Sequence, residues 1–313
     1  MATGRPSQSQ IQRYVNFEVV SREDIAFTHT VFVQCFFPLR HLKKTGQVHE
    51  VAHGNVSLLV RAGLLMDPHN RRSWEQREVP AGPKARLLLA YINDQAIRTN
   101  SPVIDMGESM RKFMGRNGIA VGGRNGHELI REAKNLAAAD IIIGTWEADR
   151  ARQDNVRIAR SLSFWIEKDE NQRTFWQPEL ELSKDYFEVL QNHRVPTVFP
   201  ALVAMQDNPR AMDVYVWLSY RLPRAKAPTR IPYRHLHPIF GHGIKLLKHF
   251  KVEFVSALKE ACRYYDRARI EVGGKDYITL YPSPSPVPTR YRVIRSKPLI
   301  PRSSPSSRPA ENK

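Results

Sequence analysis

The chain has 313 residues, of which 42% are hydrophobic and 9% aromatic, so it can bury a core and is not disordered throughout; its length favours about two domains. Its formal net charge of +17 points to a partner with many negative charges, and nucleic acid is the first candidate. Two distant cysteines, Cys35 and Cys262, and the absence of a long apolar run predict a cytoplasmic protein without disulfides and without a membrane contact.

The chain begins with a polar stretch that belongs to a predicted N-terminal segment, residues 1–45. Within it, Tyr14 to Phe37 suits a contact in a homodimer or packing inside the monomer, and the sequence leaves both open. The order of elements predicted after this segment occurs twice.

The first copy opens with a helix from Pro83 to Thr99, because Pro83 suits a first helical turn and apolar residues follow at helical spacing. A short strand is predicted at Val103 and Ile104, and a second helix at Glu108 to Arg116. A third helix, Asn125 to Ala139, has an apolar side and a basic side. Its predicted hairpin has strands Asp140 to Trp146 and Val156 to Ile166, joined by the polar segment Glu147 to Asn155.

The second copy begins with a helix from Pro209 to Leu222, followed by a strand at Thr229 to Ile231 and a short helix at Tyr233 to Phe240. Its third helix is predicted from Ile244 to Tyr264, with an apolar seam on one side. The seam consists of Ile244, Leu247, Phe254, Leu258 and Cys262. A hairpin follows, with Gly273 and Gly274 at the turn and a return strand to Tyr281.

Helix, short strand, helix, helix and hairpin is the order of a winged helix, whose third helix enters a major groove. The sequence therefore predicts an α+β, mainly helical fold with two tandem winged-helix domains, residues 46–197 and 198–282, each with a β-hairpin wing. A disordered basic tail rich in Pro and Ser is predicted over residues 283–313.

The strongest sign of a polyanion partner lies in the second copy. From Val214 to Val252 the chain runs 39 residues without an acidic side chain, and this stretch contains eight Lys or Arg residues. Basic residues on the two third helices and on the first wing are candidates for phosphate contacts and base reading, although solvated faces are an equal alternative for any single residue. The predicted DNA-binding residues are Arg124, Asn125, His127, Arg131, Lys134, Arg150, Arg152, Lys245, Lys248, His249, Lys251 and Lys259.

One enzyme signal competes with this interpretation. His235-Leu236-His237 matches the His-hydrophobic-His metal motif of relaxases and rolling-circle initiators, and Tyr264 and Tyr265 are candidate nucleophiles. On a helix, residues two apart diverge, so the sequence predicts ordinary surface or capping histidines and no metal site. No catalytic residues and no cofactor are expected.

Several segments together resemble plasmid-encoded RepA replication initiators. They are the sequences at residues 37–40, 53–58, 83–101, 113–114 with 122–124, and 213–221, in this order. The resemblance spans roughly residues 35–282. It implies tandem winged-helix modules that bind repeated origin sequences in double-stranded DNA, help to open the duplex and recruit host replication proteins, without a catalytic centre.

The predicted function is therefore a non-enzymatic plasmid replication initiator, with possible homodimerisation left open. Two alternatives remain: a DNA-nicking initiator or relaxase that uses the tyrosines and histidines named above, and a winged-helix transcriptional repressor. The sequence does not give the DNA site, the oligomeric state that binds or the host proteins.

Overall fold

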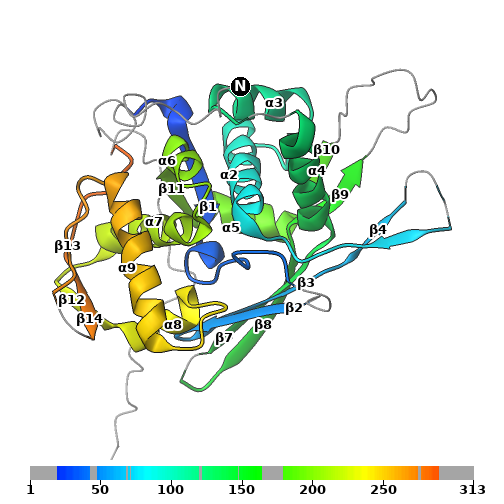
Figure 1. The fold of residues 1–313 in the computed structure, drawn as a ribbon. Coiled ribbons are helices and arrows are strands. Elements are labelled where there is room, and N and C mark those ends of the chain that lie inside the picture. The colour runs from blue at the N-terminus through cyan, green and yellow to red at the C-terminus, as the bar shows by residue number, and fades with distance from the viewer. Residues whose placement is uncertain are drawn as a thin grey trace, which may run out of the picture.

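The protein is a mixed α/β structure in which one order of elements occurs twice (Figure 1). The computed structural model describes residues 20–42, 48–67, 70, 72–119, 122–146, 148–163, 179–273 and 276–288. We call residues 82–182 the first unit and residues 209–280 the second unit.

The first unit begins with three helices and one intervening strand. These are α2 (Gly82–Thr99), β6 (Val103–Asp105), α3 (Glu108–Arg116) and α4 (Gly123–Ala138). Pro83 stands in the first turn of α2, and Asn100 ends the helix in the left-handed conformation, with φ of 49°. Strands β9 (Ala159–Ser163) and β10 (Glu179–Leu182) complete the unit, with β10 between β6 and β9 and antiparallel to both.

The second unit repeats this order. Its helices and first strand are α7 (Pro209–Arg221), followed by the short turn η3 (Leu222–Arg224), β12 (Thr229–Pro232), α8 (Tyr233–Phe240) and α9 (Leu247–Arg263). The hairpin strands are β13 (Ile270–Glu271) and β14 (Tyr277–Leu280), and β14 lies between β12 and β13. The last strand is thus central in both three-stranded sheets. The predicted order of elements is confirmed in the second copy, whereas in the first copy β7 and β8 stand between α4 and the hairpin.

The predicted hairpin of the first unit was wrong in its second strand. Strand β7 (Asp140–Trp146) pairs with β8 (Ala151–Arg157), so the second strand begins at Ala151 rather than Val156. This pair belongs to a separate four-stranded sheet with β2 (Val48–His53) and β3 (Val56–Arg61), in the order β2-β3-β7-β8. The hairpin that corresponds to the second unit's β13 and β14 is β9 and β10. Strand β8 is an exposed edge strand held by backbone bonds to β7, and Val156 is its only β-branched or aromatic residue, so composition gives little sign of its start.

Helix α9 begins at Leu247, three residues later than predicted. The residues before it form a turn, in which Gly243 has φ of 80° and the Ile244 N–H donates to the Gly241 carbonyl at 2.8 Å. The predicted seam was wrong at its start, because Leu247 is 45% exposed. Phe250, not anticipated, is fully buried and joins Phe254 and Leu258 in the core.

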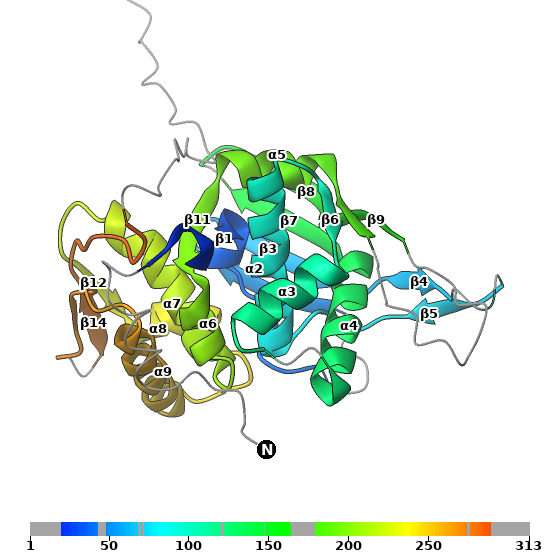
Figure 2. The same ribbon diagram turned by 90° about the horizontal axis from the view of Figure 1, so that it is seen from above.

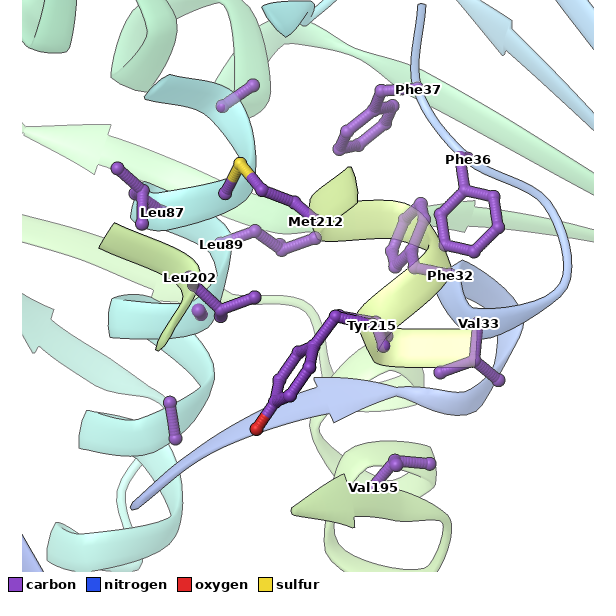
Figure 3. Close-up of a cluster of buried hydrophobic side chains, with 14 of the residues drawn as sticks. Phe32, Val33, Phe36, Phe37, Leu87, Leu89, Val195, Leu202, Met212 and Tyr215 are labelled. Atoms are coloured by element: carbon purple, nitrogen blue, oxygen red, sulfur yellow. The ribbon is translucent and has the colours of Figure 1, made fainter. Parts of the chain in front are cut away.

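The N-terminal segment packs inside the monomer. Strand β1 (Ile25–His29) lies between the turns η1 (Arg22–Asp24) and η2 (Thr30–Val33) and pairs antiparallel with β11 (Arg194–Val198). Phe32, Val33, Phe36 and Phe37 extend from this segment into a core shared with α2, α6 (Phe199–Ala204) and α7, as Figure 3 shows. The described residues of this segment, from Val20 onward, therefore pack inside the monomer, which is one of the two roles that the sequence left open.

A buried ion pair joins the two units beside this core. Arg86 of α2 donates through Nε and Nη2 to the two carboxylate oxygens of Asp213 of α7, each at 2.6 Å. The same guanidinium donates to the carbonyls of Phe37, Pro38 and Gly82. All five N–H groups of Arg86 are therefore satisfied where the N-terminal segment, the first unit and the second unit meet.

Three further features complete the described chain. Helix α5 (Lys184–Asn192) precedes β11, and a hairpin of β4 (Leu64–Met66) and β5 (Trp74–Gln76) projects beyond α4 (Figure 2). Residues 283–288, predicted as the start of a disordered tail, are instead packed on the second unit: Val287 is fully buried, and the Tyr265 hydroxyl donates to the Pro284 carbonyl at 2.8 Å. The remainder of the predicted tail, residues 289–313, lies outside the described residues. None of the described helices combines the length and apolar character that crossing a membrane requires.

Candidate nucleic-acid interface

Helix α4 presents a basic outer face. Leu129, Ala133 and Leu136 pack into the core and fix the rotation of the helix. On the opposite side Arg124, His127 and Arg131 are exposed and Lys134 is partly buried, so these four predicted residues share one face.

Two residues in the first turn of α4 differ in their surroundings. The Arg124 side chain is 93% exposed and its Nε lies 3.2 Å from Glu128 Oε1, one turn further on. Such an exposed pair contributes little to stability, and its arginine can exchange the carboxylate for a phosphate. Asn125 lies one position round the helix toward the core and is half-buried. The two side chains therefore do not point in the same direction.

Arg131 lies at the edge of a polar cluster on α4. Its Nη2 is 2.9 Å from His41 Nε2, which is itself 3.1 Å from Glu132 Oε1. Only 1% of the Glu132 side chain is exposed, and its other oxygen accepts the Ala81 N–H at 3.1 Å. The hydrogen bond to Glu132 raises the pKa of His41 above its ordinary value. This cluster ties the N-terminal segment to α4 and holds Arg131 in place from one side.

Helix α9 presents the second basic face. Lys248, His249 and Lys259 are exposed, while the Lys251 ammonium lies 5.2 Å from the centre of the Tyr233 ring. Lys245 is exposed in the turn before the helix begins. The predicted basic residues of the second copy are thus placed on α9 or at its start, opposite the buried Phe250 and Phe254.

Arg150 and Arg152 lie on the hairpin that directly follows α4, as predicted, but this hairpin is not part of the first three-stranded sheet. Both are exposed on the β7–β8 hairpin, which belongs to the four-stranded sheet and not to the three-stranded sheet of the first unit. Arg152 is on strand β8 and forms an exposed ion pair with Asp154 at 2.7 Å. The structure does not bring these two arginines into the hairpin that follows α4 in the three-stranded sheet.

The candidate nicking residues do not form a cluster. His235 is exposed, whereas His237 is half-buried, with its Nε2 2.6 Å from the Ile244 carbonyl oxygen and its ring against Phe250. Tyr265 is buried, and burial raises the pKa of the half-buried Tyr264. Among the residues that the structure describes, no three His, Cys, Asp or Glu side chains are placed to hold a metal ion.

Sequence reasoning missed several residues that share these surfaces. On α9, Val252, Ser256 and Arg263 are exposed in line with Lys248 and Lys259. Helical spacing is the signal that could have identified two of them: Val252 and Arg263 follow Lys248 and Lys259 by four residues, and residues four apart lie on one face of a helix. The projecting β4–β5 hairpin had no such signal, because its strands are only three residues long.

The two basic helices lie on the two flanks of the molecule. Figures 1 and 2 both place α4 on one flank and α9 on the other, with α2 and α6 between them. The described residues thus form a mixed α/β protein that repeats one unit and gives each repeat a third helix with a basic outer face.

Comparisons with known proteins agree with a mixed α/β protein of the replication-initiator class. Residues 79–231 match the family described as plasmid encoded RepA protein. The match confirms the resemblance to RepA replication initiators that was noted from the sequence. No curated protein matches the chain.

Two crystal structures of domains 2 and 3 of RctB are similar to it. The structure of the selenomethionine derivatives has a TM-score of 0.52 at 9% sequence identity and covers 81% of this chain and 98% of the RctB chain. The second has a TM-score of 0.50 at 10% identity, with coverage of 82% and 97%. At these identities the likeness concerns the fold.

Proposed function

We propose that this chain is a plasmid replication initiator that binds repeated origin sequences in double-stranded DNA, with each unit acting as a winged helix. One observation carries the proposal: the same order of elements occurs twice, and both times the third helix has a buried apolar side and a basic outer face. The match to plasmid encoded RepA proteins supports it.

Within this proposal the two faces have different roles. Arg131 is held beside His41 and Glu132, so it is already oriented for a base edge, and a preoriented arginine favours discrimination between sequences. Lys248 and Lys259 are exposed on α9, and flexible ammonium groups suit phosphates irrespective of sequence. Arg124 and Lys134 extend the basic face of α4 along the backbone of the duplex.

The proposal includes no catalytic step. Opening of the origin, recruitment of host replication proteins and a cytoplasmic location are part of it, and homodimerisation is left open. The nicking alternative is disfavoured by the divergence of His235 and His237 and by the burial of Tyr265. A transcriptional repressor uses the same contacts, and the position of the protected DNA separates the two functions.

The test is a binding titration with variants of each face. Lys259→Ala is expected to weaken specific and random DNA alike and to lower the slope of log K against log salt by about 1. Arg131→Ala is expected to reduce discrimination by about 1–3 kcal/mol, mainly on the specific site. Lys184→Ala is the matched control, because Lys184 is also exposed and lies at the start of α5, outside both faces. Equal losses on both DNAs for Arg131→Ala would refute its reading role, and an unchanged salt slope for Lys259→Ala would refute its phosphate contact.

A further inference from the structure

The β4–β5 hairpin carries an apolar face that no other described part of the protein covers. Met66 lies directly opposite Trp74, and Leu64 is on the same face as Met66 because side chains two apart on a strand point the same way. The exposed fractions are 56% for Leu64, 51% for Met66 and 66% for Trp74. Three large apolar side chains on one face of a two-stranded ribbon, all more than half exposed, are unusual for a surface without a partner.

This hairpin is fixed to α4 at both ends. Where the chain enters it, Gly63 lies so close to the end of α4 that a Cβ atom there would be 1.9 Å from the Ala138 carbonyl oxygen. Where the chain leaves it, Arg77 Nε and the Glu78 N–H both donate to the Asn135 side-chain oxygen, at 3.3 and 3.4 Å. The base is closed by the Arg77 N–H, which donates to the Gly63 carbonyl at 3.0 Å. The position of the hairpin is therefore set by the helix that we propose to lie in the major groove.

The charge around the hairpin favours a polyanion over another protein. Residues 61–77 contain four arginines against one Asp and one Glu; Arg61 is paired with Asp140 and Arg77 with Glu75, while Arg72 is exposed. The neighbouring α4 adds Arg124, His127, Arg131 and Lys134 on its outer face. An apolar face framed by positive charge suits DNA, since the walls of the minor groove are sugars flanked by phosphates. Proteins that bind this groove commonly insert Leu or Met side chains against the bases.

We infer that the β4–β5 hairpin is a second DNA-binding element, which places Leu64, Met66 and Trp74 in the minor groove next to the major groove occupied by α4. This inference rests on the proposed function and adds a contact outside the two basic helices. A minor groove follows each major groove along the duplex, so an element that extends outward from α4 meets the flanking DNA.

The experiment compares two duplexes that contain the same footprinted repeat. One extends by about 10 base pairs, one helical turn, beyond the edge bound by the first unit, and the other stops at that edge. Wild-type protein is expected to bind the long duplex about tenfold more tightly, the size of one or two buried apolar contacts. The variant Met66→Ser/Trp74→Ser is expected to lose this preference while it binds the short duplex as wild type does. Val48→Ser, which removes an equally exposed apolar side chain from strand β2, is expected to keep the preference.

Each other outcome overturns the inference. A double variant that still prefers the long duplex shows that the hairpin does not contact the flank. Equal losses on both duplexes show that it acts through α4 or the fold. A preference restored only when the flank is single-stranded assigns the hairpin to unpaired bases instead of the minor groove. Wild-type protein that binds neither duplex above random DNA overturns the proposed function and this inference with it.

Discussion

Removal of Asp213 is expected to destabilise the whole protein, because it leaves a buried arginine without its counter-charge. The Arg86 and Asp213 side chains are 10% and 6% exposed, and two hydrogen bonds of 2.6 Å join them. Loss of one partner of such a pair costs about 3–5 kcal/mol. The substitution Asp213→Leu should lie near the lower end, about 3 kcal/mol, because Arg86 keeps its bonds to the carbonyls of Phe37, Pro38 and Gly82.

Urea unfolding followed by tryptophan fluorescence measures this cost. The double variant Arg86→Met/Asp213→Leu is expected to recover much of it, since it leaves no unpaired charge and fills the space with apolar atoms. Asp154→Leu is the control: it removes the exposed partner of Arg152, and its cost should stay below about 1 kcal/mol. The reasoning is refuted by an Asp213→Leu cost as small as the control's, or by a double variant less stable than both single variants.

Two further predictions concern stability. Gly63→Ala is expected to lower the free energy of unfolding by about 1–3 kcal/mol, because the added Cβ would meet the Ala138 carbonyl. Gly115→Ala in α3, where no atom lies within 4 Å of the added Cβ, should raise it by about 0.5 kcal/mol. Urea unfolding measures both, and a loss of stability at both glycines or at neither contradicts this reasoning. His41 has a folded-state pKa raised by Glu132, so its contribution to stability is full below its ordinary pKa of about 6.5 and is lost as pH rises through the raised value. The free-energy gap between wild type and His41→Gln should therefore be larger at about pH 5.5 than at about pH 8.5, and a gap constant with pH counts against it.

The sequence predicted most helices, because they follow strong local rules. Pro83 and Pro209 stand in the first turn of two of them, and apolar residues at helical spacing identify their buried faces. It also predicted the repeated order, and with it which helices have basic outer faces. These features depend on residues within a few turns of one another.

Features that depend on distant contacts were not predictable. Arg86 and Asp213 are 127 positions apart, and His41 meets Glu132 from a segment that the sequence treats separately. Strand pairing failed for the same reason: β7 has β3 and β8 as neighbours, and nothing near Asp140–Trp146 shows that strand Val56–Arg61 lies beside it. The hairpin that contains Arg150 and Arg152 was therefore assigned to the wrong sheet.

The most direct test of the central claim is footprinting of the purified protein on DNA that contains its own coding region and flanks, with the same samples run on a denaturing gel. The proposed initiator predicts protection of repeated sequences at an origin, lost as salt rises, with both strands intact. Protection of a promoter alone, random binding, or nicked DNA with protein attached to one end would contradict it, and the last result would make Tyr264, Tyr265, His235 and His237 the first residues to mutate.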